Sequence, residues 1–294
     1  MNYNKSAIRI SLRNKVRNLV ESCFKYKVWP AFRVMRDMPN ENLYADINDG
    51  VRLINLGAGE YFYHPKWINL DIYKEELITK CDHLKYFDLR DSAKKSFPYE
   101  NVSAVYCAHT LEHLQDSLVC SVLKMIHKAL EENGVFRIVV PDADLILENY
   151  KCGNIGFFQC YKSWFEARSN EGQCFEIEDY LVQLIATPKC RFYNEKYRRC
   201  ESLEPDDVKR AFSNRKSDYE FLDWMVAGLS DNNESGTDHL SWHSFNKLKD
   251  LLITTGFRDV YRSSFGQSKF PPMQDVPLFD STLPFLSMYI EARK

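Results

Sequence analysis

The sequence VRLINLGAG, residues 51–59, decides the fold class. Its first six residues form a short apolar run, which is typical of a buried strand, and the run ends in Gly57, Ala58 and Gly59. Glycine at such a turn lets backbone N–H groups approach a ligand closely. Open α/β sheets bind cofactors at the edge where a buried strand runs into such a turn. The stretch therefore predicts a cofactor-binding α/β sheet.

Strand-like and helical segments alternate on both sides of this stretch. Further strands are expected at 67–72, 84–89, 102–107, 135–140, 259–264 and 286–292. Helices are expected at 116–132, capped by Asp116 or Ser117 and stopped by Gly134, and at 241–255, ended by Gly256. Such alternation predicts a parallel sheet with crossover helices.

Changes in composition divide the chain into four expected parts. These are a basic amphipathic arm (1–36), a cofactor-binding half (37–150), an acceptor-binding insertion (151–237) and a completion of the sheet (238–294). The insertion is rich in aromatic residues, which suit either stacking on sugar faces or a core of its own.

Charge is distributed unevenly over the 294 residues. Residues 1–36 carry a formal charge of +8 and the remainder −10, so the acidic body argues against nucleic-acid binding. The arm has apolar residues at helical spacing, which fits a docked helix, a helix at an anionic membrane surface or a mitochondrial presequence. No apolar run is long enough for a membrane span. The nine cysteines stand singly, which favours a reducing, cytoplasmic location, with the arm at the inner membrane face if it binds lipid.

Asp71 ends the second expected strand, where a carboxylate can accept hydrogen bonds from both hydroxyls of a ribose. A full GxGxxG pattern is absent, because Phe62 stands at the third glycine position. Asp71 also follows Gly57 by 14 residues, fewer than the ~20 typical of dinucleotide sites. A nicotinamide oxidoreductase is therefore disfavoured, and a tight turn with a capping aspartate stays the structural alternative.

These residues resemble the class I S-adenosylmethionine-dependent methyltransferases. The similarity lies in six ordered motifs: NLGAGE (55–60), WINLDI (67–72), FDL (87–89), CAHTLEHL (107–114), LEENGVFRIVVPD (130–142) and HLSWHSFNKLKDLLITTGF (239–257). It covers about 51–150 and 238–294 and leaves the arm and the insertion unexplained. The resemblance implies a Rossmann-like α/β sheet, mostly parallel with an antiparallel last strand. A helical or irregular insertion would precede the final helix and strand pair.

The resemblance also implies S-adenosylmethionine as cofactor and assigns its contacts. The residues that would line the methionine and its methyl group are Gly57, Ala58, Gly59, Cys107, Ala108 and His109. Asp71 would bind the ribose and Ile72 would lie against the adenine. Asp88 would accept a hydrogen bond from the adenine amino group, and the Leu89 amide would meet a ring nitrogen. The segment 60–66 is shorter and more aromatic than the family's usual first helix.

His109, Glu112 and His113 are spaced to share one face of a helix. The HxxEH pattern is also that of inverted zinc peptidases, which the preceding glycine-loop sheet disfavours. Some members of the resembled family bind magnesium through this segment and a distal histidine. In this sequence His239 is the candidate for the distal histidine. Because His109 replaces a glutamate there, we expect no metal among the site residues. The structural alternative to a role in the site is that Glu112 and His113 only support the start of a helix against the sheet.

Methyl transfer requires a nucleophile aligned with the sulfonium–methyl bond and water excluded. A hydroxyl acceptor must also lose a proton, which a histidine near neutral pH can take. His239, which follows Asp238, and His109 are the expected catalytic bases. Asp142, or no protein base at all, remains open.

The tail, ending in LSMYIEARK, is similar to methyltransferases of bacterial surface-polysaccharide clusters. This resemblance implies O-methylation of a sugar hydroxyl, on a nucleotide sugar or a lipid-linked glycan. The alternatives are a methyltransferase for a small metabolite and a non-catalytic partner protein that binds S-adenosylmethionine.

Overall fold

The structure, a computed structural model, describes residues 40–48, 50–59, 66–72, 84–159, 174–192, 200–230, 238–276 and 278–294. The chain forms two compact units, 1–42 and 43–294. The expected arm, 1–36, lies outside the described residues. A 3-10 helix, η1 (Asn40–Tyr44), spans the boundary between the units. The second unit covers the expected parts from residue 43 onward.

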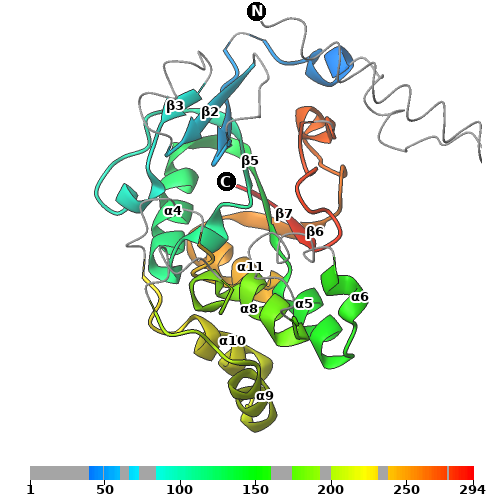
Figure 1. The fold of residues 1–294 in the computed structure, drawn as a ribbon. Coiled ribbons are helices and arrows are strands. Elements are labelled where there is room, and N and C mark those ends of the chain that lie inside the picture. Colours follow the sequence, from blue (N-terminus) through cyan, green and yellow to red (C-terminus); the bar gives the residue numbers. More distant parts are fainter. Residues whose placement is uncertain are drawn as a thin grey trace, which may run out of the picture. The chain divides into compact units, whose positions relative to one another are not determined.

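A seven-stranded sheet forms the centre of the second unit (Figure 1). Its strands are β1 (Leu53–Leu56), β2 (Trp67–Asp71), β3 (Leu84–Tyr86), β4 (Val102–Ala108), β5 (Leu130–Pro141), β6 (Arg258–Ser263) and β7 (Ser287–Arg293). Their order is β3-β2-β1-β4-β5-β7-β6. The first five pair in parallel, and β7 runs antiparallel to both of its neighbours. The expected fold class, mostly parallel with an antiparallel last strand, is confirmed.

The strand order reverses between β1 and β4. From β1 the chain proceeds outward to β3 and then crosses back to β4 on the other side of β1. The loops that leave β1 and β4 therefore diverge to opposite sides and open a crevice at the carboxyl ends of these strands. The sheet topology alone marks this crevice as the place where a ligand would bind.

Apolar side chains cover both faces of the sheet. On one face, α4 (Asp116–Ala129) and α11 (Phe245–Thr254) bury their apolar sides against strand residues such as Val105 and Phe136. On the other face, Tyr106 and Tyr289 pack with Met273 and Phe279 from the segment between β6 and β7. That segment contains the 3-10 helix η6 (Pro271–Gln274) and returns the chain to the crevice at residues 278–282.

The described part of 151–237 is mainly helical. Its elements are α6 (Ile155–Phe158), α8 (Ile177–Ile185), η5 (Thr187–Lys189), α9 (Pro205–Asn214) and α10 (Asp218–Val226). They share one apolar core with α5 (Ala143–Lys151), and buried aromatic side chains such as Phe158, Tyr180 and Phe221 fill it. These aromatic residues therefore serve the helical core. No helix among the described residues is long and apolar enough to cross a lipid bilayer.

The boundary between α4 and β5 differs from the expectation. The helix ends at Ala129 and the strand begins at Leu130, so Gly134 lies inside the strand and does not stop the helix. A Cβ at Gly134 would lie 2.9 Å from the Glu131 carbonyl of the same strand and 3.0 Å from the Val102 carbonyl of β4, so glycine relieves crowding from both. The predicted caps Asp116 and Ser117 are also wrong, because Gln115 occupies the cap position without a side-chain hydrogen bond.

Candidate functional site

A cavity of about 390 Å³ lies at the carboxyl ends of β1 and β4. Its wall contains four of the predicted cofactor residues: Gly57, Ala58, Gly59 and Ala108. The remaining lining residues are Asn55, Tyr106, Leu278, Asp280, Ser281 and Thr282. The cavity thus combines the glycine loop with the segment between β6 and β7.

The glycine loop packs closely against the end of β2 and against Thr110, which follows β4. Gly57 and Gly59 have φ of +71° and +67°, a conformation that other residues adopt only with strain. The amides of Gly57 and Ala58 donate to the Leu70 carbonyl at 2.9 and 3.2 Å, which fixes the loop to the end of β2. A Cβ at Gly57 would lie 2.0 Å from Thr110 Oγ1. Glycine is therefore the residue that lets the loop and the segment after β4 meet.

Asp71 faces the same loop from the end of β2. Its Oδ2 accepts a hydrogen bond from the Gly59 amide at 2.8 Å, and its Oδ1 accepts one from the Ile72 amide at 2.6 Å. Burial raises the pKa of Asp71, and the two amide hydrogen bonds only partly offset this effect. The carboxylate therefore lies at the edge of the glycine loop, where the resemblance places a ribose.

Asp88 has structural partners of its own. It caps the 3-10 helix η2 (Leu89–Asp91) by accepting from the Arg90 amide at 2.9 Å, and it pairs with the Arg90 guanidinium at 2.7 Å. Burial raises the pKa of Asp88, but the hydrogen bonds and charge of Arg90 outweigh burial and lower it. Leu89 is buried beside it. A hydrogen bond from an adenine amino group would share this carboxylate with Arg90.

Side chains on β4 alternate between the core and the cavity. Tyr106 and Ala108 line the cavity, whereas Cys107 between them is fully buried in the apolar core under α4. Burial raises the pKa of the Cys107 thiol to about 12. Cys107, one of the predicted cofactor residues, is therefore not among the residues that line the cavity, and its thiol lies in the core.

The segment after β4 is a single 3-10 turn, η3 (Leu111–His113), in place of the expected α-helical face. His109, with φ of +48°, precedes it. Its Nδ1 lies 3.2 Å from Glu112 Oε1, and its Nε2 lies 2.9 Å from Ser287 Oγ and 3.1 Å from the Thr282 carbonyl. His109 therefore connects Glu112 with the cavity wall at Thr282.

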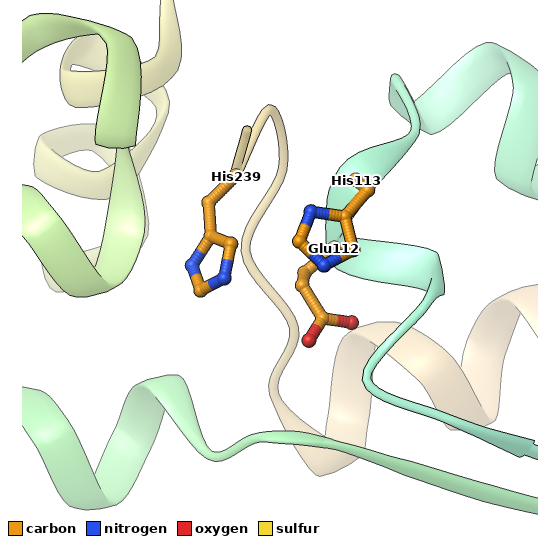
Figure 2. A group of neighbouring side chains, drawn as sticks. All are labelled: Glu112, His113 and His239. Carbon is orange, nitrogen blue, oxygen red and sulfur yellow. The ribbon is translucent and has the colours of Figure 1, made fainter. Parts of the chain in front are cut away.

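His239 and His113 meet beside Glu112 (Figure 2). His239 Nδ1 lies 2.6 Å from the Leu184 carbonyl, and the two imidazole rings are 5.0 Å apart, edge to face. Burial, together with the charge of a protonated His113, lowers the pKa of His239 to about 4. His239 is thus neutral at pH 7 and a weak base.

Glu112 is the most enclosed member of this group, with 2% of its surface exposed. Burial raises the pKa of Glu112, but the neighbouring His109, His113 and His239 lower it to about 2. The structure therefore places an ionised carboxylate among three histidines.

Asp142, the further residue considered as a base, and His243 both have structural contacts. Asp142 caps α5 by accepting from the Leu145 amide at 3.3 Å, and it forms an ion pair with Arg262. His243 is buried, with its Nε2 3.2 Å from Ser241 Oγ.

The sequence did not reveal the cavity wall at 278–282. Asp280 fixes this wall: its carboxylate accepts from the buried Arg137 of β5, with Oδ2 2.5 Å from Nη2, and its amide donates to Tyr106 Oη at 2.7 Å. No local signal links Asp280 to Arg137, which lies 143 positions earlier. An arginine at the centre of an apolar strand was the only hint that a buried acid would face it.

No model of a protein family matches the sequence, and no curated protein matches it. Among solved structures, similarity is found to an S-adenosylmethionine-dependent methyltransferase from Mesorhizobium loti (15% identity, 88% of this chain and 99% of that chain, TM-score 0.39). A second such methyltransferase, from Archaeoglobus fulgidus, is 14% identical over 94% of this chain and 98% of that chain, with a TM-score of 0.39. Human N-acetylserotonin methyltransferase, solved with S-adenosylmethionine, is 12% identical over 87% of this chain and 51% of that chain (TM-score 0.38). At these TM-scores the likeness carries no weight for the function of this chain.

Proposed function

We propose that the protein is an S-adenosylmethionine-dependent methyltransferase. The observation that carries this proposal is the cavity at the β1–β4 crevice, with the glycine loop on its wall and Asp71 bonded to that loop. A cofactor without phosphate needs neither a third glycine nor a helix start at the loop. The close approach of Gly57 to Thr110 fits a backbone cradle for such a ligand.

Asp71 and Ala108 then each have a task in binding. S-adenosylmethionine supplies a sulfonium-activated methyl group, and its transfer to oxygen breaks the S–CH₃ bond and releases a proton. Asp71 accepts the ribose hydroxyls in place of the Gly59 amide. The small side chain of Ala108 leaves room at the carboxyl end of β4, where the methyl group would lie.

His109 is the better placed of the two proposed bases. Its Nε2 lies beside the Thr282 carbonyl on the cavity wall and 2.9 Å from Ser287 Oγ, and Glu112 faces its Nδ1. To act as a base, His109 would keep its proton on Nδ1 toward Glu112, and Nε2 would accept from a hydroxyl and give up its contact with the Thr282 carbonyl. His239 is held by the Leu184 carbonyl and, with a pKa of about 4, would accept a proton less readily. In this proposal the acceptor hydroxyl replaces the Ser287 hydroxyl at His109 Nε2.

We extend the proposal to a sugar hydroxyl as acceptor on the resemblance of the tail sequence. The described aromatic residues of the helical region add no support, because they are mostly packed in its core. A nucleotide sugar is therefore the first acceptor to test, with small hydroxylated metabolites beside it.

The test is methyl transfer from isotopically labelled S-adenosylmethionine to a panel of nucleotide sugars, glycans and small metabolites, followed by mass spectrometry. We expect a labelled O-methyl product with wild type and a loss of about 10²-fold or more in Asp71→Asn. Binding of S-adenosylhomocysteine without turnover on any acceptor would favour the non-catalytic partner protein. Absence of both binding and turnover would refute the proposal.

A further inference from the structure

Three side chains converge beside the cofactor cavity. Glu112 and His113 come from η3, and His239 comes from the segment that precedes α11 (Figure 2). One ligand atom from each lies within 4.8 Å of the others. Backbone contacts hold the two segments together, since the Leu240 amide donates to the Glu112 carbonyl at 2.8 Å.

Both histidines present a lone pair on Nε2. His113 Nδ1 lies 3.0 Å from the Asp238 carbonyl and His239 Nδ1 lies 2.6 Å from the Leu184 carbonyl. A carbonyl oxygen can only accept, so each Nδ1 carries the proton and each Nε2 is free of one when the ring is neutral. Metal-binding histidines are commonly oriented by this kind of hydrogen bond.

Glu112 lacks the hydrogen bonds that a buried carboxylate needs. Its Oε2 accepts no hydrogen bond from the described part of the chain, and its Oε1 has only His109 Nδ1 nearby, at 3.2 Å. An unpaired buried charge is strongly destabilising, so such groups normally pair with a cation or coordinate a metal. The Glu112 side chain lies next to the two imidazole rings, with one ligand atom of each residue within 4.8 Å of the others.

We propose that Glu112, His113 and His239 bind a divalent transition-metal ion of the zinc class. Two imidazole nitrogens and one carboxylate oxygen suit such an ion, whereas magnesium and calcium prefer oxygen ligands throughout. Three protein ligands leave an open coordination position for water or another oxygen ligand. This site does not depend on the proposed methyl transfer.

The geometry requires only a small closure. Zinc bonds of about 2.0–2.2 Å place ligand atoms roughly 3.4 Å apart in a tetrahedral site. The ligand atoms here are within 4.8 Å of one another, so side-chain rotations bring them to bonding distance. His113 and His239 are only partly buried, which leaves a path for the ion. His109 would then contact the Glu112 oxygen that does not bind the ion.

The rival explanation is that a proton, not a metal, balances Glu112. A protonated His109 would neutralise the carboxylate at 3.2 Å and leave no need for an ion. The two accounts differ in one observable. Only the metal-site proposal predicts that the folded chain binds metal in stoichiometric amount.

The experiment measures metal directly, in the absence of S-adenosylmethionine. The full chain is stripped with a chelator and titrated with Co²⁺, whose visible absorption reports its ligands, and its zinc content is measured after reloading. We expect about one equivalent of metal and a Kd weakened about 100-fold or more in Glu112→Gln and His239→Gln. His127→Gln, which replaces another partly buried histidine, should bind as wild type does.

Circular dichroism of each variant checks that the fold is intact, and His113→Gln replaces any variant that fails this check. Wild type that binds less than a tenth of an equivalent, or a folded Glu112→Gln that binds as wild type does, would overturn the proposal. Because the measurement uses no cofactor and no acceptor, failure of the proposed methyl transfer would not affect it. Conversely, the chain can bind S-adenosylhomocysteine even if it binds no metal.

Discussion

Gly57 is the residue at which the glycine loop, β2 and the segment after β4 meet. Its φ is +71°, and a Cβ there would lie 2.0 Å from Thr110 Oγ1 and 2.8 Å from Thr110 Cβ. In Gly57→Ala the loop must therefore move away from Thr110. We expect the free energy of unfolding to fall by roughly 3 kcal/mol in urea titrations. Binding of S-adenosylhomocysteine should weaken with it.

Gly228→Ala is the matched control for this change. Gly228 has φ of +77°, but a Cβ there would meet no atom within 4 Å. Gly228→Ala should therefore lower the free energy of unfolding only by the backbone strain, about 1 kcal/mol, and leave ligand binding unchanged. Equal losses in the two variants would show that contact with Thr110 does not define the loop.

His243 makes folding stability depend on pH. Burial, followed by the charge of Lys247, lowers the pKa of His243 from 6.5 to about 4. Between about pH 4 and 6.5 the unfolded chain therefore binds more protons than the folded one, and stability falls as the pH falls through this window. By pH 5 the loss from this histidine is roughly 2 kcal/mol relative to pH 8.

Urea titrations at pH 8 and pH 5 on wild type and His243→Gln measure this effect. The decrease in unfolding free energy between the two pH values should be smaller in the variant by that amount. An identical decrease in both proteins would mean that His243 does not stay neutral in the folded state.

At the scale of elements, Arg137 ties β5 to β7 and to the cavity wall. Its fully buried guanidinium pairs with Asp280 at 2.5 Å and with Glu291 of β7 at 2.8 Å. Arg137→Met leaves both carboxylates buried without their cation. We expect a loss of about 3–5 kcal/mol in unfolding free energy, together with weaker S-adenosylhomocysteine binding, because Asp280 lines the cavity.

Arg258→Met tests whether burial causes the effect. Arg258 of β6 pairs with Glu132, but both side chains are more than half exposed. This pair should contribute less than about 1 kcal/mol. If the two arginine variants lose equal stability, burial is not what makes Arg137 important.

Elements whose signal is local could be predicted from the sequence. The strands, the glycine turn and Asp71 each depend on residues within one short stretch, and the structure has strands at all seven expected positions. The end of α4 could not be predicted, because Gly134 lies inside β5, where a Cβ would crowd the carbonyls of Glu131 and Val102, and not at the end of the helix. The wall at 278–282 likewise depends on a partner 143 positions away, which one sequence does not reveal.

At the scale of the whole molecule, charge separates the first 36 residues from the rest of the chain. Residues 1–36 carry +8 and the rest of the chain −10. We propose that the arm contacts anionic membrane surfaces, where each basic residue near the surface contributes about 1 kcal/mol. The full chain should therefore co-sediment with vesicles that contain phosphatidylserine and not with phosphatidylcholine vesicles.

Exchange of three basic residues of the arm (Arg13→Glu, Lys15→Glu and Arg17→Glu) lowers its charge from +8 to +2 and should abolish this co-sedimentation. The same change of charge on the body, made with Lys94→Glu, Lys124→Glu and Lys216→Glu, is the control and should leave it in place. Equal sedimentation of both triple variants would refute a membrane role for the arm.

The most direct test of the central claim is isothermal titration of the full chain with S-adenosylhomocysteine. Wild type should bind one molecule, Asp71→Asn should bind at least about tenfold more weakly, and NAD should not bind. Asp91→Asn, which removes a surface carboxylate paired with Lys95, should bind as wild type does. Wild type that does not bind S-adenosylhomocysteine, or Asp71→Asn that binds it unchanged, would contradict the account.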